Sequence, residues 1–186
     1  MPPTRTIETW PERIPLESRR SDLAVQIPMA TKAGFEILRA SVLGIITASG
    51  LLRRRARSNA SADAANNQKV IAVDDAAPFV AGDALKLEDG TAVGVVAVGG
   101  VNVEDNELTC VDNLAVAITD GDAILGSDGS QVAKVIANEA VKATETANTN
   151  LSPYAAGVLK RNLLVGLDES AIAELGGRVV GDDFIF

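Results

Sequence analysis

Between residues 69 and 137, short apolar runs alternate with turn-forming residues, and this pattern constrains the fold more than any other feature of the chain. The apolar runs are KVIAVDD, ALKLEDG, AVGVVAVGG, ELTCV and VAKVIA, and the turns carry Gly and Asp, as in AGD, EDG, VGG, EDN, DGD and SDGS. Short strands separated by such turns are typical of a small barrel or sandwich. We therefore expect a compact β module in this part of the chain.

The stretch GFEILRASVLGIITASGLL, residues 34–52, predicts a strand, a glycine bend and a second strand. A helix would place several apolar residues near one face, but Gly44, the β-branched cluster and the turn signal ending at Gly50 favour strands. Its apolar part, residues 40–52, is shorter than the roughly 20 residues that a membrane span requires. We expect Gly44 and Gly50 to be structural residues of a paired-strand element.

The two ends of the chain differ. Residues 1–28 hold five of the seven prolines, which disfavours a long helix and indicates an extended arm with apolar anchors. Such an arm orders either against a partner or on its own domain. Candidate contacts to a partner are Ile7, Trp10, Ile14, Leu16, Arg19 and Arg20. At the other end, Phe184 and Phe186 predict a C-terminus that docks in a core or interface.

Near the C-terminus, LDESAIAELGG predicts one short helix. Asp168 is a typical N-cap, Glu169 suits the first turn, and Gly176 or Gly177 ends the helix. With strands predicted elsewhere, the expected fold class is mainly β (α+β): a small β-rich core with this helix and an inserted small β-barrel or sandwich. A chain of 186 residues suits one domain, or one domain with an insertion.

The charge of the chain is uneven. Residues 1–57 hold ten Lys and Arg against five Asp and Glu, whereas the remaining residues hold seven against twenty. The run RRRARSNASADAANNQ, residues 53–68, is expected to be a loop whose arginines are solvated or contact a partner. The net charge of −8 and the lack of interleaved aromatic residues argue against nucleic acid as that partner.

The chemistry available to the chain is restricted. The chain has no His, which removes the commonest general base and transition-metal ligand. Cys110 is the one cysteine, so neither an internal disulfide nor a cysteine zinc cluster can form, and a buried inert thiol is expected. Asp120, Asp122 and Asp128 lack the ligand spacing of an EF-hand loop. We expect no catalytic residues, no metal and no cofactor.

Three segments carry a resemblance to a known family. RASVLGIITASGLL, with Arg39, Val42, Leu43, Gly44, Ile46 and Gly50, resembles the opening motif of lambda-type head decoration proteins of tailed bacteriophages. SDGSQVAKVIANEAV, residues 127–141, is similar to a later strand of that family, and AAGVLKRNLLVGLDESAIAELG is similar to its closing strand and helix. The resemblance covers residues 30–52 and 127–186.

The chain departs from the family between these segments. The family usually joins the first two motifs by a short link, whereas here residues 53–126 intervene as a linker and inserted β module. The family's Gly-Ile-Leu in the second motif is replaced by Lys134, Val135 and Ile136. The predicted division is an extended arm at 1–28, a decoration-like β core at 29–52 and 127–186, and the insertion at 53–126.

The resemblance implies a structural virion protein that binds the outer capsid surface and stabilises the lattice of the major capsid protein. Family members commonly act as trimers, and their N-terminal arm commonly adds to a capsid strand. The implied location is the outside of the virion, after synthesis in the host cytoplasm, with no direct contact to nucleic acid or membrane. Two alternatives stay open: a head fibre or minor head protein, and a small β-barrel binding module unrelated to capsids.

Overall fold

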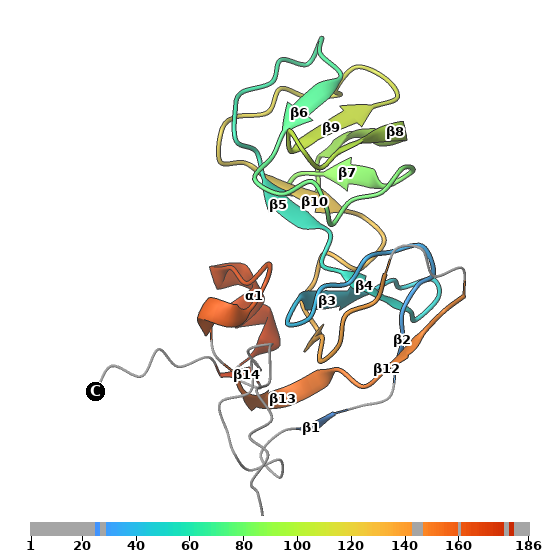
Figure 1. The fold of residues 1–186 in the computed structure, drawn as a ribbon. Coiled ribbons are helices and arrows are strands. Elements are labelled where there is room, and N and C mark those ends of the chain that lie inside the picture. Colours follow the sequence, from blue (N-terminus) through green and yellow to red (C-terminus); the bar gives the residue numbers. More distant parts are fainter. Residues whose placement is uncertain (1–24, 27–28, 143–146, 160, 177–178, 181–186) are drawn as a thin grey trace, which may run out of the picture.

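The computed structural model describes residues 25–26, 29–142, 147–159, 161–176 and 179–180. The strands form two six-stranded sheets and one two-stranded pair (Figure 1). One α-helix is found in the described residues, α1 (Glu169–Leu175), and it lies in the C-terminal part of the chain. The predicted fold class, mainly β with one short C-terminal helix, is confirmed.

The first sheet, which we call the split sheet, takes strands from both sides of the segment 57–126. Its strands in spatial order are β1 (Val25–Gln26), β13 (Tyr154–Val158), β11 (Val135–Ile136), β3 (Val42–Ile45) and β4 (Leu52–Arg54), with β14 (Val179–Val180) parallel to β13. Next to this sheet, β2 (Met29–Ala30) pairs with β12 (Asn150–Leu151), and a 3-10 turn, η2 (Arg161–Leu163), follows β13.

The second sheet lies wholly within the segment 57–126 and closes into a barrel. Its strands in spatial order are β5 (Arg57–Asn59), β10 (Ala123–Gly126), β7 (Ala84–Lys86), β8 (Ala92–Asn102), β9 (Glu107–Cys110) and β6 (Val70–Ala72). The last strand returns to the first, since Ala60 bridges Val73 and the N–H of Asp74 donates to the carbonyl oxygen of Asn59 at 2.9 Å. Closure of this kind leaves no free sheet edge.

The predicted paired-strand element is present as the hairpin β3–β4. Its strands are antiparallel, with Gly44 opposite Arg53. Gly50 makes the turn possible because its φ of +69° lies in the left-handed region. Gly44 is required for a different reason: a Cβ at this position would overlap the carbonyl oxygen of Ser130, so the two backbones meet where only glycine fits.

Each sheet has its own buried apolar side chains. The barrel encloses one cluster that includes Ile71, Val93, Leu108 and Ile124. Cys110 belongs to this cluster and is buried, as predicted, and burial raises the pKa of its thiol. The split sheet carries two smaller clusters, one of which packs against α1.

Helix α1 begins and ends as the sequence predicts. The Asp168 side chain accepts a hydrogen bond from the N–H of Ala171, which makes Asp168 the N-cap. Gly176 ends the helix with a φ of 60°, and its N–H donates to the carbonyl oxygens of Ile172 and Ala173.

Three local predictions were wrong or incomplete. The expected loop 53–68 begins in β4 and contains β5, whose backbones pair with β3 and β10. VAKVIA, which was grouped with the β module by its pattern and with the core segment 127–186 by the resemblance, belongs to the split sheet, because β11 pairs with β3 and β13. In AAGVLKRNLLVG, which resembles the family's closing strand, β13 ends at Val158. The domain boundaries stay a prediction.

The predicted arm falls mostly outside the described residues. The candidate contact residues Ile7, Trp10, Ile14, Leu16, Arg19 and Arg20 lie outside the described residues. At the other end of the chain, so do Phe184 and Phe186. The described part of the arm, β1, pairs antiparallel with β13 of the same chain. For these two residues the alternative that the arm packs on its own domain therefore holds.

Candidate functional site

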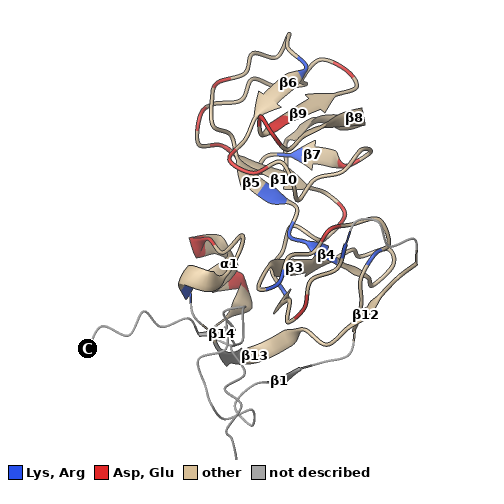
Figure 2. Ribbon diagram, viewed as in Figure 1, with Lys and Arg blue, Asp and Glu red and all other residues tan. Residues whose placement is uncertain are grey.

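Four arginines gather where the chain passes from the split sheet into the barrel. Arg53, Arg54, Arg55 and Arg57 lie at the end of β4 and the start of β5, and Figure 2 shows basic residues at this junction. We call these four side chains and their acidic partners the arginine junction. The expectation that they form a solvated or partner-binding run is wrong for Arg53, Arg54 and Arg55, which are buried inside the chain.

Arg53 connects three parts of the structure. Its guanidinium donates to both carboxylate oxygens of Asp83 at 2.8 and 2.7 Å, and to Asp128 at 2.9 Å. It also donates to the carbonyl oxygen of Pro78 at 2.6 Å and lies 4.6 Å from the ring centroid of Phe35. Burial lowers the pKa of Arg53, but the hydrogen bonds and charges of the two aspartates outweigh it and raise the pKa above its ordinary value.

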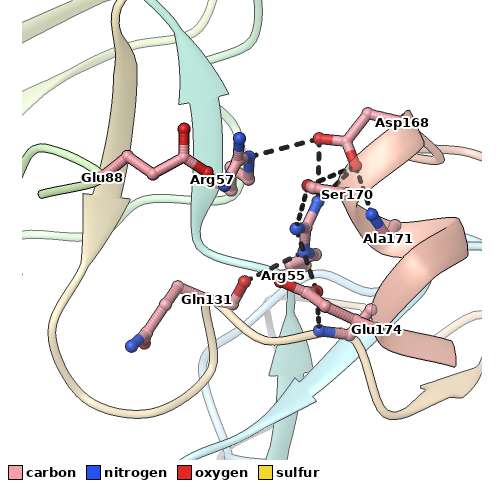
Figure 3. A network of polar contacts seen from close by, with 9 residues as sticks. Arg55, Arg57, Glu88, Gln131, Asp168, Ser170, Ala171 and Glu174 are labelled. Carbon is pink, nitrogen blue, oxygen red and sulfur yellow. Dashed lines mark hydrogen bonds and ion pairs between the residues drawn. The ribbon is translucent and has the colours of Figure 1, made fainter. Parts of the chain in front are cut away.

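Asp168 joins the helix to the junction (Figure 3). Arg55 donates to its two oxygens at 2.8 and 2.9 Å, and Arg57 Nε forms an ion pair with it at 3.3 Å. Burial of Asp168 raises its pKa, but the hydrogen bonds from Ala171 and Ser170 and the charge of Arg55 outweigh this and hold the pKa below its ordinary value. One carboxylate thus caps α1 and pairs with arginines on both sides of the β4–β5 connection.

Arg55 and Arg57 also reach beyond Asp168. Arg55 donates to the carbonyl oxygen of Gln131 at 2.9 Å and forms an ion pair with Glu174 of α1 at 3.0 Å. Arg57, the first residue of β5, pairs with Glu88 of the barrel at 3.2 Å. The two arginines therefore link the helix, the returning chain and the barrel.

A cleft of about 270 Å³ lies beside the junction, between the barrel and the loop that precedes α1. Arg54 is part of its wall and donates to Asp75 at 2.8 Å. The Ser58 hydroxyl in turn accepts from the N–H of Asp75 at 2.9 Å. The lining residues are Val42, Arg54, Arg55, Arg57, Ser58, Asn59, Asp74, Asp75, Pro78, Val165, Gly166, Leu167 and Asp168.

The chemistry of the junction suits a structural contact. Both Asp168 and Asp128 have lowered pKa values, so they stay charged at neutral pH and are weak proton acceptors. In Asp128 burial raises the pKa, and the hydrogen bonds from Ser130 and the charge of Arg53 outweigh it. Planar guanidinium groups that pair with carboxylates in two-pronged geometry fix orientation as well as charge. The arginine junction therefore holds the barrel in one orientation on the split sheet.

The junction was not found from the sequence because its partners are far away along the chain. Arg55 and Asp168 are 113 residues apart, and Arg53 and Asp128 are 75 apart. The only signal in the sequence was the arginine run beside an apolar strand, and it does not say which carboxylates it meets. Of the predicted site residues that are described, Gly44 lies in β3 beside the junction and Gly50 lies in the turn before β4.

Comparisons with known proteins give no relative: no protein-family model, no curated protein and no solved structure matches the chain. Within the described residues, no helix is both long and apolar enough to cross a membrane. The same part of the chain has no group of three or more Cys, Asp or Glu side chains placed to hold a metal ion.

Proposed function

We propose that the chain is a structural virion protein that binds the outer surface of a phage capsid and stabilises the lattice of the major capsid protein. In this proposal the protein acts as a homotrimer on the capsid, with residues 1–28 as the anchor. The observation that carries the proposal is the pairing of the two segments that resemble decoration proteins, which are separated by the whole barrel.

That pairing is direct. In β3, which belongs to the first resembling segment, Leu43 lies opposite Val135 and Val42 lies opposite Ile136 of β11, which belongs to the second. Gly44 of the first motif meets the backbone of Ser130 in the second. A barrel inserted between two strands that still pair is what an insertion into an existing decoration-type core would produce, and this supports the proposal.

The position of β1 also supports it. Among the described strands, β1 lies at the end of the split sheet and pairs with β13. Among the described strands β1 is therefore an edge strand, and backbone groups at such an edge can pair with a strand of another protein. A protein that covers a lattice needs only modest affinity at each site, because many linked contacts add to one another.

The test is co-sedimentation with expanded capsids of the cognate phage. We expect saturable binding by the full chain and at least a tenfold loss, roughly 1.4 kcal/mol, when residues 1–24 are removed, since this leaves β1 in place. A matched pair of variants separates anchoring by the arm from nonspecific apolar adsorption. Trp10→Ser should weaken binding. Leu38→Ser, which changes an exposed apolar residue of the described core, should leave binding unchanged.

The outcomes are distinct. Binding of the full chain that is lost on truncation supports both the capsid role and the arm as anchor. Equal binding by the full and the truncated chain supports the capsid role and contradicts the proposal that the arm is the anchor. No binding by either chain contradicts the capsid proposal.

A further inference from the structure

The outer face of the barrel carries exposed valines on three neighbouring strands. Val70 of β6, Val95 and Val98 of β8, and Val111 just after β9 are 39, 43, 97 and 52% exposed. We call these four residues the valine face. An isolated exposed apolar residue is ordinary, but several on adjacent strands mark an interaction surface.

The strand pairing places these residues together. Val70 lies opposite Thr109 in the β6–β9 pair. The N–H of Val111 donates to the carbonyl oxygen of Val95 at 2.8 Å, so these two residues are neighbours across β8 and β9. On the other side of Thr109 lies the segment 97–100 of β8, which contains Val98.

A bulge presents Val98 to solvent. Val96 pairs with Cys110 and Val101 pairs with Leu108, so the four residues 97–100 face the single residue Thr109. The pair that follows Val98 makes this bulge possible: Gly99 has a φ of +71°, and a Cβ on Gly100 would overlap the carbonyl oxygen of Thr109. Bulges of this kind redirect a side chain, and this one places a valine where it contacts almost nothing in its own chain.

The charge around the valine face selects its partner. Segment 57–126 holds twelve Asp and Glu against three Lys and Arg. Exposed acids lie on the same three strands or next to them, namely Glu104 and Asp105 in the β8–β9 turn and Asp112 beside Val111. The exposed base Lys69, next to Val70, also lies here and donates to the carbonyl oxygen of Val111 at 2.7 Å, so these three acids outnumber it. A second copy of this acidic face would bring like charges together, which is unfavourable, whereas a basic partner is attracted.

We propose that the valine face is a docking surface for a protein segment that carries apolar side chains flanked by Lys or Arg. The valines supply the apolar contact, and the nearby acids Glu104, Asp105 and Asp112 orient the partner. The Gly99–Gly100 bulge holds Val98 at the centre of the contact. The proposal does not depend on capsid binding, because the face belongs to the barrel, which closes on itself, whereas β1 belongs to the split sheet.

The test uses the full chain and synthetic peptides. Valine methyl resonances are recorded while a peptide of alternating Leu and Lys is added, and peptides of alternating Leu and Glu and of alternating Ser and Lys serve as controls. We expect saturable shifts at Val70, Val95, Val98 and Val111 with the Leu-Lys peptide only, and weaker binding as salt is raised. Val98→Ser should weaken that binding about tenfold, whereas Leu38→Ser should leave it unchanged.

Three results would overturn the proposal. One is the absence of saturable shifts on the valine face. Another is equal binding of the Leu-Glu or Ser-Lys peptide, which would remove the charge or the apolar part of the argument. The third is a concentration-dependent self-association of the free chain that Val98→Ser abolishes, since this would make a second copy the occupant. Thermal unfolding of Val98→Ser that matches the unchanged chain rules out misfolding as the cause of a loss.

Discussion

The barrel and the split sheet bury their apolar side chains in different ways. Every buried residue of the barrel cluster lies between Ala56 and Ile124, so one continuous stretch supplies the whole core. The clusters of the split sheet draw on residues from Ile37 to Leu175, on both sides of the barrel in sequence. The barrel therefore needs only its own segment, whereas the split sheet forms only when the chain returns after the barrel.

The chain contains a natural probe for each region. Its single cysteine, Cys110, is buried in the barrel, and its single tyrosine, Tyr154, is buried in the split sheet. Reaction of the thiol with a cysteine reagent reports opening of the barrel, and the ring resonances of Tyr154 report packing of the split sheet.

The largest expected effect comes from Gly44→Val. The added side chain would collide with the backbone of Ser130 and separate β3 from the returning chain. We expect the split sheet to lose more than about 4 kcal/mol of stability, because β3 cannot move without breaking its pairing with β4 and β11, and the Asp128 carboxylate holds the turn at Ser130. Tyr154 should lose its native resonances while Cys110 stays protected, and both are measured during urea unfolding.

Gly50→Ala is the matched control for that change. Its added Cβ meets nothing within 4 Å, so the cost is limited to the left-handed backbone, about 1 kcal/mol. If Gly44→Val unfolds no more easily than Gly50→Ala, the close approach of β3 to Ser130 is wrong. If Cys110 becomes reactive together with the loss of Tyr154, the two regions unfold as one unit.

The next effect in size is that of Arg53→Ala, which should weaken both regions together. Loss of the guanidinium leaves the carboxylate of Asp83, whose side chain is 9% exposed, without its charge partner, and removes the contact with Asp128. Breaking one side of a buried ion pair costs about 3–5 kcal/mol. We expect the midpoints reported by Cys110 and Tyr154 to fall together in urea unfolding.

Arg54→Ala is the neighbouring control. Its partner Asp75 has a side chain that is 43% exposed, so water replaces the lost hydrogen bond and the expected loss is about 1 kcal/mol. Equal losses for the two variants would show that burial at Arg53 carries no special cost.

The same difference between the regions explains what the sequence could predict. Turn residues and short apolar runs act locally, so the strands β6, β7, β8 and β9 were predicted at nearly their observed positions. The caps of α1 are also local: the sequence predicts Asp168 at its start and Gly176 or Gly177 at its end, and the structure has Asp168 and Gly176. Each of these features depends on neighbours a few residues away.

Long-range pairing could not be predicted in this way. Arg57 lies in an apparently polar loop, yet it begins β5 because β10 pairs with it after the chain has gone round the barrel. Arg53 and Arg55 are buried only because carboxylates from distant segments neutralise them. Composition alone predicts that a charged run is an exposed loop. Such a run becomes part of a core only where carboxylates from distant segments pair with it.

The smallest expected effect is the response to acid, and it separates the two regions again. Asp168 has a lowered pKa in the folded chain, so its contribution to stability is present above the ordinary aspartate pKa, about 4, and is lost as the pH falls through the lowered value. Because its side chain is 42% exposed, solvent screens the effect and keeps it small. In urea unfolding at decreasing pH, the Tyr154 ring should report this loss, since α1 packs on the split sheet.

Asp168→Asn isolates that contribution. The amide oxygen can still accept from the N–H of Ala171 and cap the helix, but the charge that meets Arg55 and Arg57 is gone. The variant should be less stable near neutral pH and should show a shallower decline in acid at Tyr154, with no change at the Ile71 methyl resonance in the barrel. An equally steep decline in both chains would assign the acid response to other carboxylates, and a change at Ile71 would mean that the arginine junction transmits the loss into the barrel core.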